Sequence, residues 1–459
     1  MPNIRGNIKP NTDKALTPTA YALNAIILTN HKGEQADIQN LVTDFSITES
    51  LYTAAMIVKL NIKDSANFIE EYQLIGQETI QIKMGRHDYT NPEWTNVDLT
   101  FYVTEYPIFA RGEQANTQAY AIVGVSKQAY VSQFKRLSRA VNDTISKEIS
   151  RILSKDLFAD NVKYIEPTIG RFNGVLPLMN PLNSAYWLLR RAYDQTSRPF
   201  FLYESMIGGI RMESLTSLID EDKNPNYRTY RDAKLFHSTP GSAEYFKESI
   251  ERILDISSDF KLSKVLPTIG NGAYASNNVF MDLSTKSITQ QPFSYNSLNV
   301  KSTTLNKNSV LSNTFGVPYE QASDIRNLSK TYDAFVEYMP INSLAYSSDG
   351  SAKSYHDLMV DRLGIYNSIT ETFDTITHEL VVAGDFSMRP GRKITLEIPK
   401  AIDLRYFDSK AMKGNFDDYF DRTVSGKYLV AAVIHQFDAE YHCRLRIKRD
   451  SFTYDVNKS

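Results

Sequence analysis

Apolar and polar residues alternate most regularly near the C-terminal end of the chain. In residues 441–448, apolar side chains occupy the odd-numbered positions and basic side chains the even-numbered ones. Because successive side chains of a strand point to opposite faces, this pattern predicts one apolar and one basic face. Residues 394–398 alternate in the same way, and Gly391 and Gly426 stand where the chain must turn. These segments predict the last strands of an antiparallel barrel or sandwich.

The same period runs through the first part of the chain. Strands are expected at residues 21–29, 41–50, 54–62, 80–84, 99–103 and 119–125. A short helical or turn excursion is expected at 67–73. Short alternating strands with turn residues between them are typical of an all-β barrel or sandwich. Residues 20–130 are therefore predicted to form a first domain of this kind, and the polar, proline-containing residues 1–19 an extended N-terminal arm.

The period changes to three and four residues after Ser132. Apolar residues from Phe134 to Ile152 predict one amphipathic helix or two, with Asn142 and Asp143 capping a restart. A second helix is expected at 180–194. Together these predict a helical connector over residues 131–199.

The middle of the chain mixes strand and helix signals. Residues 200–290 predict a hairpin at 200–214 around Gly208-Gly209, a helix near 246–254 and a strand at 279–283. Residues 291–375 predict an inserted α+β or loop region, with a long loop at 296–330 and a helix at 355–363. Residues 376–459 return to the strand period.

Composition and charge bound the class of protein. The chain has 459 residues, a net charge of −2 and one cysteine, Cys443. The charge argues against a protein that binds nucleic acid over its whole surface, and a lone cysteine excludes intrachain disulfides. Cys443 lies on an apolar strand face, which predicts a buried side chain. The N-terminal residues lack the apolar stretch of a secretory signal, and no apolar run is long enough to span a membrane.

Motifs for catalysis or metal binding are absent from the sequence. His378-Glu379 begins like a zinc-protease motif, but the second histidine is missing and the segment has the strand period. His435 and His442 can approach across a hairpin, and a hydrogen-bonded structural pair is favoured over two metal ligands. No nucleophile elbow or phosphate-binding loop occurs. The sequence therefore predicts no catalytic residue, no cofactor and no metal site.

The basic face of the strand at residues 441–448 has two possible interpretations. Arg444, Arg446 and Lys448 are expected to form a solvated or subunit-facing surface, and contact with phosphates is the less favoured alternative.

The two ends of the chain also resemble each other weakly. In 76–125 and in 391–447, a glycine is followed by an alternating strand and then by two further strand segments. Only the period and the order match, which antiparallel strand pairs share in general.

Several pieces near the C-terminus resemble a known family. Gly384-Asp385, Pro390-Gly391, the run 425–430, His435 and the strand 441–450 are similar, in order and spacing, to the end of the baseplate hub proteins of contractile-tailed, T-even-like phages. Related barrels open the valine-glycine-repeat spikes of type VI secretion. The resemblance implies a mainly β, α+β fold, with two tube-like antiparallel barrels joined by smaller α+β domains.

In this family the second barrel is discontinuous. The resemblance therefore implies that strands from the middle of the chain join those of 376–459, and the hairpin 200–214 and the segment 276–284 are the expected donors. It also marks His435 as structural. The loop 296–330 and the polar insert 400–424 depart from the family pattern. No spike β-helix or lysozyme-like segment is present, which implies a separate spike protein.

The function implied by the resemblance is structural rather than enzymatic. The chain is expected to be a homotrimeric adaptor between a tail tube, or tube-adaptor protein, and a central spike protein, with baseplate wedge proteins as neighbours. Its pore would let DNA pass during genome ejection without specific binding. The expected location is the virion tail baseplate, assembled in the host cytoplasm. A tail-associated cell-wall hydrolase and the hub of a non-phage contractile injection system remain the alternatives.

Overall fold

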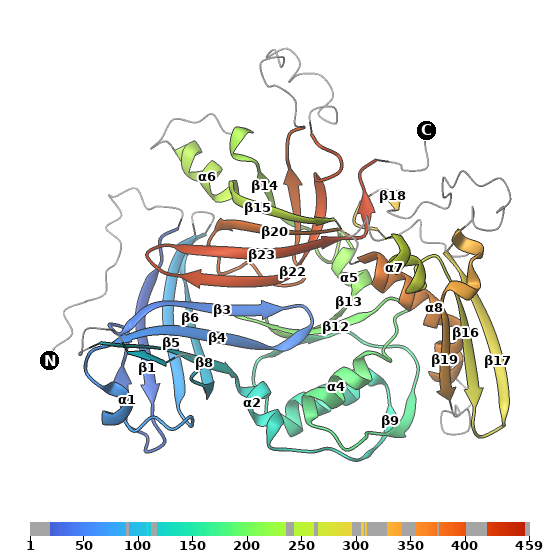
Figure 1. Ribbon diagram of the computed structural model, residues 1–459, viewed down its shortest axis with the longest axis horizontal. Coiled ribbons are helices and arrows are strands. Elements are labelled where there is room, and N and C mark those ends of the chain that lie inside the picture. Colours follow the sequence, from blue (N-terminus) through green and yellow to red (C-terminus); the bar gives the residue numbers. More distant parts are fainter. Residues whose placement is uncertain are drawn as a thin grey trace, which may run out of the picture.

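The computed structural model of the chain is mainly β, with one large sheet and a few short helices (Figure 1). The residues that it describes are 19–88, 91–107, 109–111, 117–235, 243–260, 265–295, 304–306, 308–309, 328–341, 355–373, 376–400 and 420–454. The expected N-terminal arm and most of the expected loop 296–330 and insert 400–424 lie outside these residues.

Fourteen strands from both ends of the chain form the large sheet. Its N-terminal half consists of β1 (Ala22–Thr29), β2 (Gln35–Asp37), β3 (Val42–Ser50), β4 (Thr53–Asp64), β5 (Thr79–Asp88), β6 (Asn91–Glu105), β7 (Phe109–Arg111) and β8 (Gln118–Ser126). All six expected strands are present, and β5 and β6 are longer than predicted. The helix α1 (Phe68–Glu71) confirms the expected excursion. Alternation was a reliable guide here because one face of each strand is buried.

The C-terminal half of the sheet draws on distant segments. It consists of β14 (Asn226–Arg231), β15 (Ile253–Phe260), β20 (Ile376–Ala383), β21 (Lys393–Glu397), β22 (Gly426–Phe437) and β23 (Tyr441–Arg449). Its strands lie in the order β15-β20-β23-β22, while β21 pairs with β22 and, in parallel, with β14. An isolated bridge between Arg231 and Arg252 brings β14 and β15 together.

The middle of the chain donates different strands from those expected. The hairpin of β12 (Phe200–Ser205) and β13 (Gly209–Ser214) forms as predicted, but it pairs with β10 (Val162–Ile165) in a separate three-stranded sheet. All six residues of β12 are buried, because the strand packs between the large sheet and the connector. β16 (Ala275–Asp282) likewise belongs to another sheet, between β17 (Ser287–Ser294) and β19 (Val336–Ile341). The strands that join the large sheet are β14 and β15.

The connector is less helical than its period predicts. Helix α2 (Lys127–Gln133) ends before Phe134, whose side chain is 71% exposed. The chain then forms β9 (Ala140–Asp143), which pairs with β11 (Phe172–Val175). The expected restart is present as α3 (Ile145–Arg151) and continues as a π-helical turn at Ile152–Asp156. Its N-cap position is occupied by Thr144, without a side-chain cap hydrogen bond, and not by Asn142 or Asp143 as predicted. The prediction of helix over 134–143 was wrong because pairing with β11 overrode the local period.

Helix α4 (Pro181–Leu189) confirms the second predicted connector helix over a shorter length. The side chain of Asn180 accepts a hydrogen bond from the Asn183 backbone N–H at 2.9 Å, and Pro181 occupies the first turn. Both residues are favoured at helix starts, since they satisfy or remove unpaired N–H groups.

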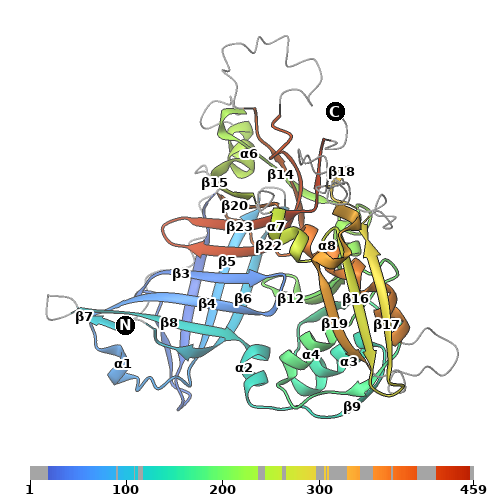
Figure 2. The same cartoon turned by 45° about the vertical axis from the view of Figure 1, so that its right-hand side comes forward.

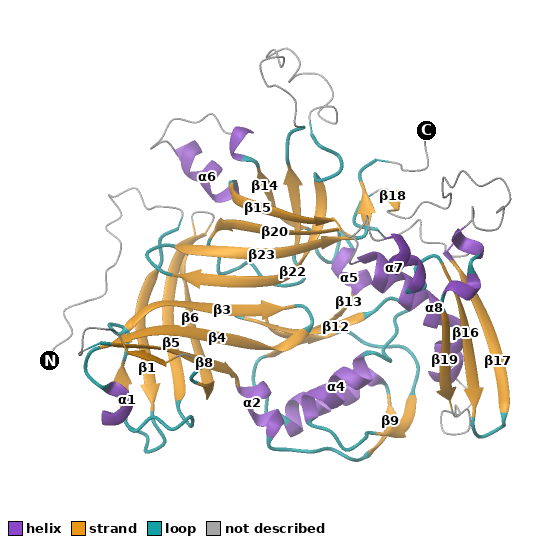
Figure 3. Cartoon of the chain, in the orientation of Figure 1, coloured by secondary structure: helices purple, strands orange, loops and turns teal. Residues whose placement is uncertain are grey.

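Further helices lie beside the sheets (Figure 3). They are α5 (Leu215–Ile219), α6 (Ala243–Glu251), α7 (Val265–Gly270) and α8 (Tyr355–Phe373). α6 begins and ends three residues earlier than predicted, because Ile253 and Leu254 enter β15 instead, and α8 is longer than predicted. A final short pair joins β18 (Asn308–Ser309) to β24 (Ser451–Phe452).

One hydrophobic core runs through both halves of the large sheet. It contains Val58 and Ile122 of the N-terminal half together with Tyr428 and Leu445 of the C-terminal half. The connector has a separate core, formed by α3, α4 and β12 among others. Burial of apolar side chains on this scale is the main favourable contribution to folding.

Candidate functional site: the joint between the two halves

The two halves of the large sheet meet where β3 pairs with β22, and we call this strand pair the joint. Its antiparallel register runs from Phe45 opposite Phe437 to Ser50 opposite Ala432. The rings of Phe45 and Phe437 stack at 4.5 Å between centroids, and the Tyr441 ring stacks on Phe437 at 4.4 Å. The joint makes one continuous sheet from strands at opposite ends of the sequence (Figure 1).

A buried ion pair lies within the joint. His435 of β22 and Glu49 of β3 are both fully buried, and His435 Nε2 lies 3.6 Å from Glu49 Oε1. The same Glu49 oxygen accepts a hydrogen bond from the Met206 backbone N–H at 2.6 Å. Because Met206 follows β12, the carboxylate connects the joint to the β12–β13 hairpin.

The second ring nitrogen of His435 faces β23. His435 Nδ1 lies 2.7 Å from Tyr441 Oη and 3.5 Å from Cys443 Sγ. Burial lowers the pKa of His435, but Cys443 and Glu49 oppose this effect and raise it to about 10. The imidazole is therefore protonated at neutral pH and can form an ion pair with the Glu49 carboxylate. An ion pair buried in this way fixes register, since a slipped strand would leave one charge unpaired.

A second polar cluster holds β14 against the loop after β20. Asp385 accepts hydrogen bonds from Tyr227 Oη at 2.6 Å and from the Ser387 backbone N–H at 2.8 Å. The guanidinium of Arg228 lies 3.2 Å from the same carboxylate. Burial alone would raise the pKa of Asp385. The opposing effects of Arg228 and Tyr227 are larger together, so the pKa lies below its usual value. Asp385 thus remains ionised and fixes the position of β14.

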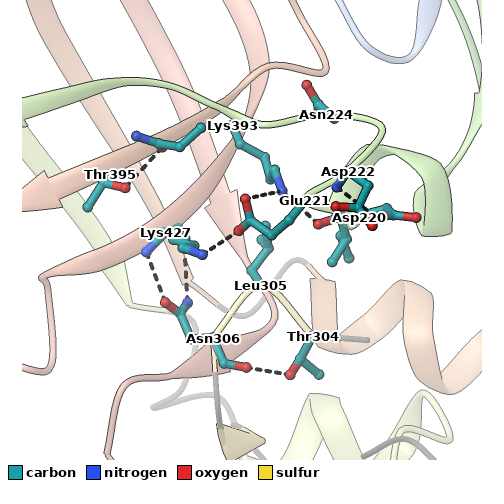
Figure 4. Close-up of polar contacts among 12 residues, drawn as sticks. Asp220, Glu221, Asp222, Asn224, Thr304, Leu305, Asn306, Lys393, Thr395 and Lys427 are labelled. Atoms are coloured by element: carbon teal, nitrogen blue, oxygen red, sulfur yellow. Dashed lines mark hydrogen bonds and ion pairs between the residues drawn. The ribbon is translucent and has the colours of Figure 1, made fainter. Parts of the chain in front are cut away.

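A third cluster attaches two loops to β21 and β22 (Figure 4). The fully buried Lys393 donates to the Ile219 carbonyl at 2.8 Å and lies 3.2 Å from Glu221. Lys427 also pairs with Glu221. Asn306 donates to the Lys427 carbonyl at 3.1 Å and accepts from its N–H at 2.9 Å, as a neighbouring strand would. Burial lowers the pKa of Lys393 despite Glu221.

The histidines singled out in the sequence serve as structural groups. His378 lies on β20, as its period predicted, and its Nε2 is 3.0 Å from Tyr428 Oη. Burial and the neighbouring Arg449 lower the pKa of His378 to about 4, so this ring is neutral. The expected hydrogen-bonded pair of His435 and His442 does not form. Gln436, not His435, is opposite His442, so the two rings point to opposite faces.

The faces of β23 follow their prediction closely. The odd-numbered side chains from Tyr441 to Ile447 are buried, including Cys443, whereas Arg444 and Arg446 are exposed. Lys448 departs from the prediction. It is buried, and its ammonium donates to Tyr52 Oη at 2.9 Å.

Sequence reasoning missed the buried charges Glu49, Asp385 and Lys393. One signal was present, because Glu49, His435 and Arg449 all fall on the apolar parity of their strands. A charge at such a position is buried and needs a partner, but the alternation does not say which residue supplies it.

Neither a metal centre nor a membrane helix is present in the described part of the chain. No three potential ligands among His, Cys, Asp and Glu gather there as a metal would require. None of its helices combines the length and the apolar character that crossing a membrane demands. The geometry of the joint and its clusters holds strands together.

The fold resembles that of proteins of known structure, although the sequence matches no family. No family model matches the sequence, and no curated protein matches it either. Among solved structures, a tail protein from Neisseria meningitidis aligns with 94% of this chain and 97% of its own, at 9% identity and a TM-score of 0.50.

Two further structures align at lower scores. The 43 kDa tail protein of prophage MuSo2 from Shewanella oneidensis covers 93% of this chain and 98% of its own, at 11% identity and a TM-score of 0.48. A component of the Escherichia coli type VI secretion system, described as similar to phage T4 tail proteins, covers 91% of this chain and 76% of its own, at 10% identity and a TM-score of 0.40. These structural neighbours are tail and secretion-system proteins, and over nearly its whole length the chain has the fold of the Neisseria meningitidis tail protein.

Proposed function

We propose that the chain is the baseplate hub protein of a contractile phage tail, a structural adaptor that joins the tail tube to the central spike. The observation that carries the proposal is the joint, at which two sets of strands with similar order become one sheet. The tail-protein fold supports it. The proposed role needs rigid, correctly spaced surfaces, and the buried contacts of the joint supply rigidity.

The proposed assembly is a homotrimer with pseudo-sixfold symmetry. An adaptor between a sixfold tube and a threefold spike has to present six similar surfaces on one side and three on the other. Two similar barrels in each of three chains meet both demands. In the C-terminal half, the bridge between Arg231 and Arg252 supports a barrel, since it brings edge strands β14 and β15 together. Closed symmetry also covers exposed strand edges and ends association at a fixed number of chains.

The remaining parts of the proposal concern partners and place. A separate spike protein, a tube or tube-adaptor protein and wedge proteins are the proposed neighbours, in the baseplate of a virion assembled in the host cytoplasm. The ring encloses a pore through which DNA passes. The lining of this pore should not be strongly basic, since phosphate contacts would retain the duplex.

Mass measurement of the purified chain, followed by electron microscopy, tests this proposal. The expected result is a trimeric ring with six similar lobes around a pore. A stable dimer, or a trimer in which each chain contributes one lobe, contradicts it. A parallel assay of peptidoglycan cleavage by the purified chain tests the alternative that it is a hydrolase, and no cleavage is expected. Cleavage that is lost when a single carboxylate is changed would show an enzyme instead.

A further inference from the structure

A large groove separates the connector from the inserted sheet. It lies between α4 and β12 on one side and β19 and α8 on the other, and its volume is about 1210 Å³. Aromatic side chains line its walls, among them Tyr52, Trp187, Phe201 and Phe373, and we call it the aromatic groove. Pockets for small molecules are typically about 300–1,000 Å³. The aromatic groove is larger and matches a segment of polypeptide.

The strand beside this groove has an unpaired edge. β19 pairs with β16, and no other strand in the described ranges pairs with it. The Asn277 N–H donates to the Phe335 carbonyl, so the odd-numbered residues of β19 direct their backbone groups toward β16. The backbone groups of Val336 and Tyr338 therefore point away from β16. Pro340 has no N–H, which keeps the free edge short.

This free edge faces the connector. In both Figure 1 and Figure 2, β19 is the strand of its sheet that lies nearest α4. The side chains of Val336 and Tyr338 are exposed, whereas Glu337 and Met339 line the groove. An extended segment lying along β19 would thus gain backbone hydrogen bonds and contact the aromatic walls at the same time.

The charges of the groove favour an acidic occupant. Arg190 is exposed on α4 and makes no ion pair within the described residues. The guanidinium of Arg191 lies 3.8 Å from the centre of the Trp187 ring, and Lys448 provides a third cation.

The acidic residues of the groove are already engaged. Glu337 accepts a hydrogen bond from Asn367 at 2.7 Å, and Glu371 accepts one from Asn271 at 3.1 Å. The two carboxylates keep their charge, but the three cations Arg190, Arg191 and Lys448 outnumber them, so the net charge of the groove lining is positive.

We propose that the aromatic groove is a docking site for an extended segment of a partner protein, rich in acidic and apolar residues, which adds as a strand to β19. This site does not rest on the hub assignment, because its evidence is the free edge of β19 and the charges around it.

A short peptide of the stated chemistry tests the proposal on the full chain. The probe is a fluorescent, end-blocked hexapeptide that alternates valine with aspartate, and its control alternates valine with lysine. Fluorescence anisotropy should show saturable binding of the aspartate peptide, weakened by added salt. The lysine peptide should bind at least about tenfold more weakly. Absence of saturable binding up to millimolar peptide, or equal binding of the two peptides, overturns the proposal.

One substitution separates strand addition from simple apolar contact. Tyr338→Pro removes an N–H from the free edge and leaves the ladder to β16 intact, because that ladder uses the odd-numbered residues. Tyr338→Thr removes the same ring and keeps the N–H. With both variants melting as the parent does, the proline variant should lose at least about tenfold in affinity relative to the threonine variant. Equal affinities overturn strand addition.

A charge reversal tests the acidic recognition. Arg190→Glu should weaken binding of the aspartate peptide by about tenfold. Arg446→Glu, on the exposed face of β23, changes the net charge equally and should leave binding unaltered. If both variants weaken binding to the same extent, the effect is one of net charge and the docking site is refuted. If Tyr338→Pro instead changes the oligomeric mass of the chain, the occupant is a second copy and the proposed partner is wrong.

Discussion

The two halves of the large sheet are built from similar strands but are held together differently. In the N-terminal half, the buried carboxylates outside the joint bond mainly to nearby backbone. Asp64 accepts from the N–H groups of Ala66 and Phe68, and Glu78 from that of Gly76. These contacts stabilise turns within a continuous stretch of chain.

Buried polar groups of the C-terminal half join residues far apart in sequence. Lys393 bonds to Ile219, Asp385 to Tyr227, and Asn306 to Lys427. The apolar faces of the two halves are equally buried, so hydrophobic burial does not distinguish them. A directional hydrogen bond specifies which segment docks where, whereas apolar contact is non-directional. The comparison teaches that a sheet assembled from separate segments needs polar contacts to select its strands.

The largest expected effect is common to both halves. Leu445→Asp and Val58→Asp each place an unpaired charge in a fully buried position, and each should destabilise the protein by about 4 kcal/mol or more. Arg446→Ser, on the exposed face of β23, should change stability by less than about 0.5 kcal/mol. Urea unfolding measures all three. Equal shifts for Leu445→Asp and Arg446→Ser would contradict the assigned faces of β23.

Removing one charge from the joint should rank next. Glu49→Gln leaves the buried imidazolium of His435 without its carboxylate and should cost about 3 kcal/mol. In the double variant with His435→Gln the loss should be smaller than the sum of the two single losses, because the changes share one interaction. A thermodynamic cycle from chemical denaturation tests this, and strict additivity would mean that the pair is not coupled.

Substitutions in the polar contacts should then separate the two halves. Lys393→Met removes the contacts of a buried ammonium with Ile219 and Glu221 and should cost about 2 kcal/mol. Asp64→Ala removes a local cap at α1 and should cost about 1 kcal/mol. Hydrogen exchange should rise in β14 for the lysine variant and only around α1 for the aspartate variant. Identical exchange patterns would remove the distinction between distant and local contacts.

The last prediction concerns the pH dependence of stability, to which the two buried histidines contribute with opposite signs. The folded-state pKa of His435 is about 10, above 6.5, so its contribution is complete below pH 6.5 and is lost as the pH rises toward 10. The folded-state pKa of His378 is about 4, below 6.5, so its contribution is complete above pH 6.5 and is lost as the pH falls toward 4.

Melting temperatures measured from pH 4 to pH 10 distinguish these two cases. His435→Gln should flatten the curve on the alkaline side only, and His378→Gln on the acidic side only. A flattening on the same side in both variants would show that one of the two protonation states is assigned wrongly.

Strand periods were the most predictable part of the molecule. The alternation of β23 located its buried face, and Gly391 and Gly426 adopt the positive φ angles of 80° and 139° that their turns require. These features depend on local chemistry, and the sequence contains it in full.

Pairing was much less predictable, because it depends on which segments meet in space. The period of residues 134–143 favoured a helix, yet β9 pairs with β11. The hairpin of β12 and β13 was recognised, but its sheet was not. In the candidate site, His435 was identified as structural, while its partner Glu49 lies in a strand almost the whole chain away. The alternation of apolar and polar residues shows that a charged side chain is buried, but it does not identify the residue that pairs with it.

The joint also has a consequence for synthesis of the protein. Phe45 reaches its register partner Phe437 only after about 390 further residues (437 minus 45) have been made. At a typical elongation rate of about 5–20 residues per second, the outer edge of β3 stays uncovered for roughly 20 to 80 seconds. An open strand edge is a template for wrong pairing with other nascent chains. Slower translation therefore lengthens the time during which β3 can pair with a wrong strand.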